Sequence, residues 1–464
     1  MNAPVLAQTE SVCPVCLATI AATRIVEGDD VYLVKRCTEH GEFRTVVWRG
    51  LDTYQRWAAR GSRAATPPVT ETPVAHGCPH DCGICPDHRQ HSCCVLLEVT
   101  QRCNLRCPVC FAAAGRDGDD PSLADIDGWL DRLREHASQV NIQLSGGEPT
   151  LRDDLPEIIR RVRQRGFDFV QVNTNGLRLA REPGYAQTLA EAGLDCAFLQ
   201  FDGVSNAVYQ HIRGARLVDI KEQAIARCAE AGLAVVLVPT LMPGVNVGEI
   251  GAIIDFALAR VPVVRAVHFQ PVSYFGRYPA APADSQRITL PEVMAEIERQ
   301  TAGRIRVADF GPGASENVFC SFVGKFEVDA AGQLRSTRPA TTGCCSTGTS
   351  GCGCGTPPDD EDGPRSRRIV ARQWAARGRQ DSGDPPAAGD LSSFDAFLAA
   401  RGQSLSISGM AFQDAWNLDL ERLRECFIHV VSPDRRVIPF CAYNLTSASG
   451  ETLYRVVERE LADA

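Results

Sequence analysis

The chain has 464 residues, of which 44% are hydrophobic, and a formal net charge of −9 at pH 7. It is long enough for one large domain with smaller additions, and it has no apolar run of the length that crosses a bilayer. The acidic balance argues against bulk electrostatic binding, so no nucleic-acid partner is expected. The first residues lack the basic and apolar regions of a secretory signal, which predicts a cytoplasmic location.

The 20 cysteines of the chain fall mostly into compact groups. In a reducing compartment, clustered cysteines serve as metal ligands or catalytic groups more often than as disulfides. Cys196 and Cys228 are exceptions, because they lie within apolar or helix-like stretches, and they are expected to be core thiols. The remaining groups indicate where metals bind.

Residues 1–60 predict a small metal-binding ribbon. Cys13 and Cys16 form one pair of ligands, Cys37 and His40 form another, and β-rich runs lie beside them. Paired ligands at this spacing are typical of a mononuclear zinc site. A rubredoxin-like iron is the alternative, although such a site usually has four thiolates, and His40 could instead be a turn residue.

A Pro-, Thr- and Ala-rich stretch at residues 61–77 indicates a linker, and a cysteine-rich segment follows at residues 78–94. The spacing CX3CX2C in this segment predicts an auxiliary 4Fe–4S cluster that is closed by a fourth thiolate. The predicted ligands are Cys78, Cys82, Cys85 and Cys94, with the adjacent Cys93 as the other source of the fourth thiolate. Zinc is the alternative, with His80, His88 or His91 beside the cysteines.

Residues 95–280 alternate strand-like and helix-like segments, which is the pattern of β–α units around a parallel sheet. The expected strands are residues 95–100, 140–147, 169–176, 196–203, 234–241 and 264–273. The segments with helical spacing are residues 123–137, 155–166, 184–193, 218–232 and 247–260. An α/β fold with a partial (β/α)6 barrel is therefore predicted, since no seventh or eighth unit is clear after residue 275.

Cys103, Cys107 and Cys110 follow the first strand of this barrel as a second CX3CX2C. Three protein thiolates leave one iron of a 4Fe–4S cluster open, and the amino and carboxylate groups of S-adenosylmethionine (SAM) can chelate that iron, whereas a fourth cysteine would close the site. The position after a strand, without a convenient fourth cysteine, favours this triad over the one at residues 78–94. A structural zinc or iron site is the alternative.

The segment LSGGEPT ends the second predicted strand, one β–α unit after the triad. Gly146 and Gly147 let the backbone come close to a bound ligand. Glu148, which precedes Pro149, can accept hydrogen bonds from the SAM ammonium group. The GGEP segment and the triad together support a SAM site more strongly than either motif alone.

Residues 281–464 predict a C-terminal auxiliary-cluster region with a flexible insertion at about 343–390. Ordered structure is expected to resume after it, with a hairpin whose turn is at residues 432–436 and a helix at residues 451–464. The predicted ligands of a third cluster are Cys320, Cys426 and Cys441, completed by one or more of Cys344, Cys345, Cys352 and Cys354. The alternatives are a mobile cysteine tail for metal delivery and a free-thiol loop.

Over residues 95–275 these motifs resemble the radical SAM superfamily. The resemblance implies that the triad binds the SAM cluster and that the GGEP segment binds the methionine end of SAM. It also implies that Asn173, Asn175 and Asp202, at strand ends, contact SAM or substrate, with Asp202 favoured over Asn175. Turn formation is the alternative role for these polar residues.

The whole chain is similar to a group that includes tetraether lipid synthase and relatives of the molybdenum-cofactor pyranopterin synthase, through segments such as HGCPHDCGIC, EVTQRCNLRCPVCFA and IHVVSPDRRVIPFC. This likeness implies that SAM is cleaved to a 5′-deoxyadenosyl radical, which abstracts hydrogen from an unactivated carbon to couple lipid hydrocarbon chains. The alternatives are methylation of a pterin-like ring and peptide modification. A small-molecule or lipid substrate and a flavodoxin- or ferredoxin-type electron donor are implied, and peripheral membrane contact stays open.

A hypothesis of a different class is an iron–sulfur electron carrier or regulator without enzymatic activity. The GGEP segment on a six-unit barrel disfavours a carrier, because a carrier needs no SAM site, and the acidic charge disfavours a DNA-binding regulator. The sequence therefore predicts a radical SAM enzyme with a SAM-binding 4Fe–4S cluster, one or two auxiliary 4Fe–4S clusters, and a mononuclear zinc or iron.

Overall fold

The computed structural model describes a large part of the chain, namely residues 3–61, 65–67, 69–115, 117, 119–136, 140–313, 316–329, 332–337, 374 and 404–455. Apart from Trp374, the predicted insertion lies outside the described residues, and so do four of the predicted third-cluster ligands, Cys344, Cys345, Cys352 and Cys354. Of the helix predicted at residues 451–464, only residues 451–455 are described, and they are not helical.

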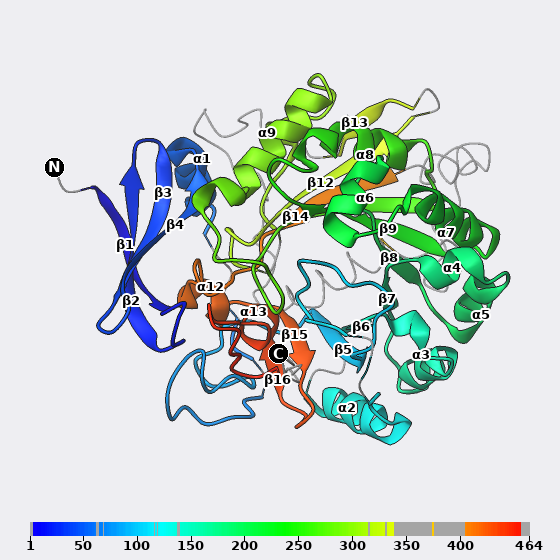
Figure 1. The fold of residues 1–464 in the computed structure, drawn as a ribbon, viewed down its shortest axis with the longest axis horizontal. Coiled ribbons are helices and arrows are strands. Elements are labelled where there is room, and N and C mark those ends of the chain that lie inside the picture. Colours follow the sequence, from blue (N-terminus) through cyan, green and yellow to red (C-terminus); the bar gives the residue numbers. More distant parts are fainter. Residues whose placement is uncertain are drawn as a thin grey trace, which may run out of the picture.

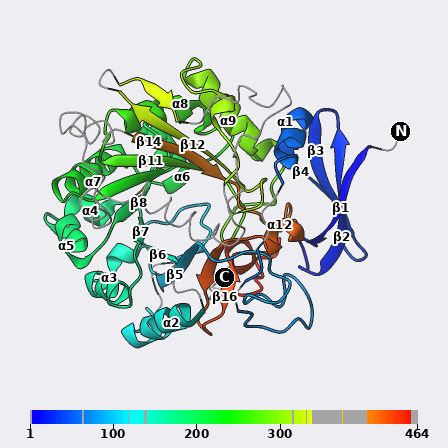
Figure 2. The same cartoon turned by 180° about the vertical axis from the view of Figure 1, so that it is seen from behind.

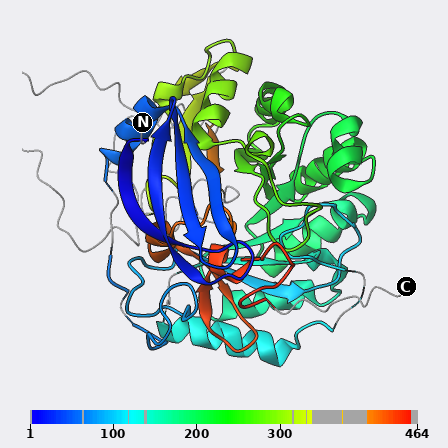
Figure 3. The same cartoon turned by 60° about the vertical axis from the view of Figure 1, so that its left-hand side comes forward.

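The N-terminal ribbon is an antiparallel sheet with the strand order β1-β2-β3-β4 (Figures 1 and 3). Its strands are β1 (Val5–Val12), β2 (Thr19–Glu27), β3 (Asp30–Cys37) and β4 (Gly41–Arg49). Helix α1 (Leu51–Ala58) follows, and its Tyr54 ring stacks on the Phe319 ring with centroids 4.6 Å apart. Lys35 is buried and donates from Nζ to the Ala415 carbonyl at 2.7 Å. The ribbon is therefore packed onto the C-terminal half of the chain.

The main sheet is mostly parallel, with the strand order β13-β12-β14-β11-β9-β8-β7-β6-β5-β15-β16, and β10 pairs with β11. The strands of its first half are β5 (Cys94–Thr100), β6 (Asn141–Gly146), β7 (Val170–Thr174), β8 (Cys196–Gln200), β9 (Ala234–Val238), β10 (Thr240–Leu241) and β11 (Val264–Pro271). The later strands are β12 (Ser321–Val328), β13 (Leu334–Ser336), β14 (Ser404–Met410), β15 (Ile428–Val431) and β16 (Val437–Pro439).

The predicted six-strand parallel barrel is confirmed, because β5, β6, β7, β8, β9 and β11 coincide with the six predicted strands. The C-terminal region adds two further parallel strands at opposite edges, since β14 pairs with β11 and β15 pairs with β5. Neither added strand follows a β–α repeat in sequence, which explains why the unit pattern does not reveal them. The predicted hairpin turn is confirmed between β15 and β16.

Helices cover the outer side of the curved sheet, where α2, α3, α5 and α7 form a continuous layer (Figures 1 and 2). The helices after α1 are α2 (Leu123–His136), α3 (Leu155–Gln164), α4 (Leu177–Arg181), α5 (Tyr185–Ala192), α6 (Asn206–Arg213), α7 (Val218–Glu230), α8 (Ile250–Leu258), α9 (Leu290–Gln300), α12 (Leu420–Arg424) and α13 (Phe440–Tyr443). Short 3-10 turns are η1 (Pro149–Leu151), η2 (Val247–Glu249), η3 (Asp284–Gln286) and η4 (Val307–Asp309). Within the described residues, no helix combines the length and apolar character needed to span a membrane.

The two faces of the sheet differ in polarity because side chains alternate along each strand. On β6, Ile142 and Leu144 are fully buried in the apolar core beneath the helices. Gln143 and Ser145, on the opposite face, line an internal cavity. The outer face therefore provides the hydrophobic core, and the inner face provides a site.

A buried ion pair ties the end of the described chain to the first barrel strand. Arg455 NH1 donates to Glu98 Oε2 at 2.9 Å, and NH2 donates to Asn444 Oδ1 at 2.7 Å. The Arg455 and Glu98 side chains are 2% and 5% exposed. The last described residues thus pack against the main body.

Replacing Arg455 by Met should destabilise the protein by about 3–5 kcal/mol, because the Glu98 charge would stay buried without its partner. The matched control is Arg436→Met, since Arg436 pairs with Asp434 at the surface, where both side chains are more than a third exposed, and should cost less than about 1 kcal/mol. Urea unfolding followed by circular dichroism measures both. Equal losses in the two variants would contradict a structural role for the buried pair.

Candidate functional site

The inner face of the main sheet borders a cavity of about 470 Å³. One part of its wall is neutral and polar, with Gln143, Ser145, Gln171, Asn173, Gln200, His268 and Ser408. Another part is aromatic, with Phe111, Phe275, Phe412 and Phe440. Concave, largely apolar pockets with a few fixed polar groups are where small ligands bind, so this cavity is the candidate active site.

The predicted cysteine triad lies on the loop between β5 and α2, and Cys103, Cys107 and Cys110 all line the cavity. The loop is fixed by backbone bonds, from Cys103 N to the Gly115 carbonyl at 2.6 Å and between Cys110 and Arg277 in both directions at 2.9 and 3.0 Å. Burial, with smaller effects of Cys110 and Cys107, raises the pKa of the Cys103 thiol to about 12. The three thiols therefore lie on one loop beside one cavity. Among the described residues, the group whose ligand atoms all lie within 4.8 Å of one another is in the ribbon, so a cluster shared by the triad stays a prediction.

The two glycines of the GGEP segment allow close contact with the triad loop. A Cβ on Gly146 would lie 2.1 Å from the Thr100 carbonyl oxygen, and one on Gly147 would lie 2.2 Å from the Arg102 carbonyl oxygen. Gly147 N donates to that Thr100 oxygen at 2.7 Å, and Glu148 N donates to the Arg102 oxygen at 2.8 Å. Glycine is thus required here for contact between two loops, and because both glycines also border the cavity, the predicted contact with a ligand stays a prediction.

The Glu148 carboxylate is 1% exposed and borders the cavity. It accepts hydrogen bonds from Thr150 N at 3.1 Å, Thr174 Oγ1 at 2.8 Å and Asn175 N at 2.7 Å. Burial raises the pKa of Glu148, and these donors oppose the rise. The carboxylate is therefore held in one orientation, with Pro149 beginning the turn η1 directly after it.

The three polar residues expected at strand ends lie in different surroundings. Asn173 and Asn175 line the cavity, and Asn175 Nδ2 donates to Asn104 Oδ1 at 2.7 Å. Asp202 is fully buried behind the wall and accepts two bonds from Arg213, from Nε at 2.7 Å and from NH2 at 2.8 Å. The Asp202 side chain therefore does not line the cavity, but it bonds to Arg213, which does.

Arg213 itself lines the cavity and interacts with the Cys107 side chain. Asp202 raises the pKa of its guanidinium despite burial, so the positive charge is retained. Thiols, a cation and a buried carboxylate around one cavity fit a cluster together with the carboxylate and ammonium groups of SAM.

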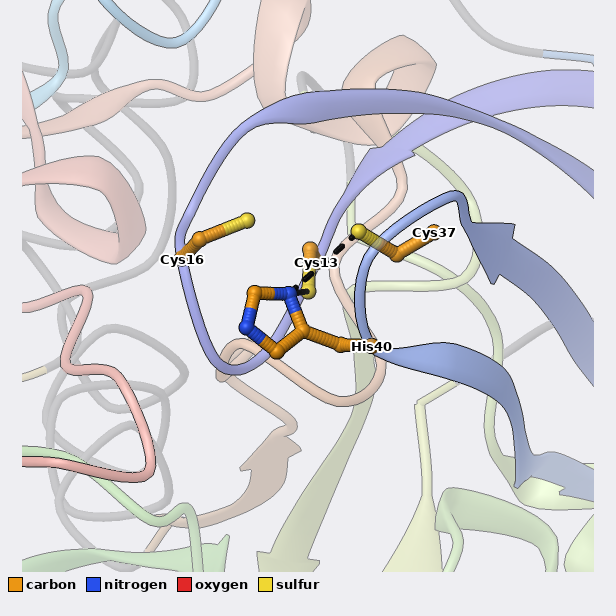
Figure 4. Close-up of side chains that lie close together, drawn as sticks. All are labelled: Cys13, Cys16, Cys37 and His40. Atoms are coloured by element: carbon orange, nitrogen blue, oxygen red, sulfur yellow. Dashed lines mark hydrogen bonds between the residues drawn. The ribbon is translucent and has the colours of Figure 1, made fainter.

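The ribbon brings its four predicted ligands together, as Figure 4 shows. The ligand atoms of Cys13, Cys16, Cys37 and His40 all lie within 4.8 Å of one another. His40 Nδ1 is 3.6 Å from Cys13 Sγ and 3.5 Å from Cys37 Sγ. A bond from the Glu39 backbone and one from His40 lower the pKa of the Cys37 thiol to about 6. This arrangement fits one tetrahedral metal ion.

In the segment at residues 78–94, Cys78, Cys82 and Cys85 are all buried. A bond with Cys78 and burial raise the pKa of the Cys82 thiol, and burial together with Cys78 raises that of Cys85. Cys94, the predicted fourth ligand, lines the cavity and donates to Gln143 Oε1 at 3.4 Å. Cys93 is buried beside it. Whether either closes a cluster stays a prediction.

The described cysteines of the predicted third group come from distant parts of the chain. Cys320 precedes β12, Cys426 precedes β15, and Cys441 lies in α13. Burial dominates the raised pKa of the Cys441 thiol, with smaller contributions from Cys426 and Cys320. Arg422 NH2 donates to Cys320 Sγ at 3.5 Å, which places a cation beside this group.

The polar wall of the cavity was missed by sequence reasoning. His268 and Gln143 occupy inward positions of predicted strands, and the alternation of polar with apolar residues there was the available signal. Ser408 carried no signal, because its strand β14 was not predicted. Arg213 was missed because a basic residue at the end of a helix is usually exposed.

Comparisons with known proteins agree with this geometry. A family model of the radical SAM superfamily matches residues 97–257, and a model of the HMPTM N-terminal zinc ribbon domain matches residues 5–49. The first covers most of the barrel with the triad and the GGEP segment, and the second covers the ribbon with its four converging ligands.

Three proteins illustrate the relationships of the chain. It is 36% identical, over 94% of its length and 93% of the relative, to 7,8-dihydro-6-hydroxymethylpterin dimethyltransferase of Methanocaldococcus jannaschii. It is 32% identical to a probable GTP 3′,8-cyclase of Methanothermobacter thermautotrophicus, over 37% of this chain and 55% of that protein. The structure of Streptococcus suis SuiB bound to S-adenosylmethionine aligns over 46% of this chain and 48% of that one, with 15% identity and a TM-score of 0.36.

The radical SAM prediction is thus confirmed, while the relative that spans the chain is a pterin dimethyltransferase rather than a tetraether lipid synthase. The chain is an enzyme that belongs to the radical SAM superfamily and, within it, to the family of this pterin dimethyltransferase.

Proposed function

We propose that Cys103, Cys107 and Cys110 hold the 4Fe–4S cluster to which SAM binds, and that the reaction methylates a pterin-like ring. The observation that carries the proposal is that the triad, the GGEP segment and a neutral polar wall all border one cavity. The relative that matches nearly the whole chain is named for dimethylation of a pterin. This favours the alternative of the sequence analysis over lipid coupling.

The proposed SAM site uses two fixed charges. The Glu148 carboxylate, oriented by donors from Thr150 and Asn175, accepts hydrogen bonds from the SAM ammonium group. Arg213, oriented by Asp202, faces the SAM carboxylate. Asp202 is then a positioning residue, which differs from the direct contact that the resemblance implied.

When bound at these residues, a 4Fe–4S cluster with SAM would supply the radical chemistry that removes a hydrogen atom from the substrate, and a separate one-carbon donor would supply the methyl group that replaces it. The chain contributes a wall that excludes water from this chemistry. Phe440 lies at the centre of it, with ring centroids 5.7 Å from Phe111 and 6.2 Å from Phe275. These side chains border the cavity beside Cys110.

The part of the cavity wall that the proposed SAM site does not use suits a pterin chemically. A pterin is a flat ring with hydrogen-bond donors and acceptors on its edges. Gln143 and Asn173 present amides to the cavity, and Phe198 presents an aromatic side chain. Amides satisfy both donors and acceptors, and aromatic faces stack on planar rings. A long hydrocarbon chain would form no hydrogen bonds with these amides.

Coupling of hydrocarbon chains is the second candidate, and one observation favours it. Phe412 and Phe440 have ring centroids 4.4 Å apart and continue the aromatic wall from the triad toward Cys441. An apolar path between the triad and a third cysteine group suits a lipid radical that is held on sulfur. Chain coupling is the second candidate because a hydrocarbon would form no hydrogen bonds with the polar part of the cavity wall.

The function is tested with anaerobically reconstituted protein, dithionite and SAM. 5′-Deoxyadenosine should form above the level of a Cys103→Ala control, and 7,8-dihydro-6-hydroxymethylpterin should raise its rate of formation. Pterins extracted from expressing cells should gain the mass of one or two methyl groups. Stimulation by an archaeal-type lipid but not by the pterin would favour chain coupling, and equal activity of the Cys103 variant would contradict the proposed triad.

Replacing Gly147 by Ala should reduce SAM cleavage about a hundredfold, since the new Cβ would displace the triad loop by an ångström or more. Gly248→Ala is the matched control, because a Cβ there meets no atom within 4 Å. 5′-Deoxyadenosine formation per iron bound measures the effect. Normal activity of the Gly147 variant would show that the loop contact does not position the cluster.

A further inference from the structure

His268 and Ser408 form a polar pair on the cavity wall that the SAM site does not use. They are directly opposite each other on the parallel strands β11 and β14. His268 Nδ1 and Ser408 Oγ are 2.8 Å apart, and both residues line the cavity. Among the described residues, the second ring nitrogen, Nε2, has no hydrogen-bond partner.

The imidazole of this pair is neutral near pH 7. His268 is 8% exposed, and burial lowers its pKa to about 4. A neutral imidazole bonded at Nδ1 presents Nε2 as a donor or as an acceptor, depending on the tautomer that the serine hydroxyl selects. The Nε2 atom of this pair can therefore bond to either a hydrogen-bond acceptor or a hydrogen-bond donor on the edge of a ligand.

A chain of hydrogen bonds fixes the polar groups on β6 and β7 of the same cavity. Gln143 Nε2 donates to Asn173 Oδ1 at 2.5 Å, and Asn173 Nδ2 donates to Ser145 Oγ at 3.2 Å. The Cys94 thiol donates to Gln143 Oε1. Each amide is thus oriented before any ligand arrives, which lowers the entropy cost of binding.

An aromatic side chain lies between these two polar groups. The Phe198 ring on β8 has its centroid 5.7 Å from the His268 ring. Cations are scarce on the wall: of the described lining residues, only Arg213 and Lys325 carry a positive charge. Arg213 pairs with Asp202, and Lys325 is exposed. The pocket suits a neutral planar ring rather than a phosphorylated one.

We propose that His268 and Ser408 bind one edge of a neutral, planar heteroaromatic substrate, while Gln143 and Asn173 bind another edge and Phe198 contacts its face. This rests on the proposed function and deepens it, because it assigns the residues that select the ring and excludes a phosphate ester as the preferred substrate. His268 is a substrate-binding residue in this account.

The test is a fluorescence titration of the SAM-loaded protein with 6-hydroxymethylpterin, a stable fluorescent analogue. His268→Ala and Ser408→Ala should each weaken binding about tenfold, as expected for one lost hydrogen bond inside a cavity. His268→Gln should restore much of the affinity, because an amide can replace the imidazole contact. His211→Ala is the matched control, since His211 is exposed on α6 and should leave affinity unchanged.

Two further readouts separate binding from structural damage. The His268 and Ser408 variants should keep the iron content and the unfolding temperature of the unaltered enzyme, and the control His211→Ala should also keep its substrate-free 5′-deoxyadenosine formation. Adding a phosphate ester to the hydroxymethyl group of the analogue should weaken binding to the unaltered enzyme. Tighter binding of the ester would overturn the preference for a neutral ring.

The outcomes also distinguish this inference from the proposed function. If the unaltered protein binds no pterin, the proposed substrate is wrong, and the assigned pocket fails with it. If the unaltered protein binds the pterin and both alanine variants bind it equally well, only the assignment of His268 and Ser408 is overturned.

Discussion

The contact between the triad loop and the end of β6 is the constraint on which the site depends. Gly146 and Gly147 approach the carbonyl oxygens of Thr100 and Arg102 so closely that a side chain at either glycine would collide with them. The following residue, Glu148, then turns its carboxylate toward groups at the end of β7. One close backbone contact therefore aligns the ends of three neighbouring strands around the cysteines.

The polarity of the sheet's inner face is the second determinant. Parallel sheets covered by helices are usually apolar on both faces, and burying amides without partners is costly. Here Gln143 and Asn173 bond to each other, and Ser408 bonds to one ring nitrogen of His268. The strands thus keep a polar interior at little cost in stability. The C-terminal region completes this interior, because β14 supplies Ser408 and α13 supplies Phe440 to the cavity.

The periodicity of apolar residues was enough to predict the six barrel strands, because each strand is an apolar run that is followed by a helix. It was not enough for β14 and β15, whose pairing partners are far away in sequence. Cysteine spacing identified the ribbon ligands, which the structure brings together. The spacing of residues in the sequence could not reveal the ion pair between Arg213 and Asp202. A contact between a side chain at a strand end and one at a helix end leaves no periodic signal in the sequence. His268 was not predicted as a site residue, because a lone histidine in a predicted strand resembles a core residue.

The central claim is that the triad of Cys103, Cys107 and Cys110, and not the similarly spaced cysteines at residues 78–94, carries the iron to which SAM binds. Electron paramagnetic resonance of the reduced protein, with and without SAM, tests it most directly, because a ligand on an open iron changes the spectrum of that cluster. The account predicts that Cys107→Ala loses the SAM-dependent change and that Cys82→Ala keeps it. A change that disappears in the Cys82 variant and persists in the Cys107 variant would contradict the account.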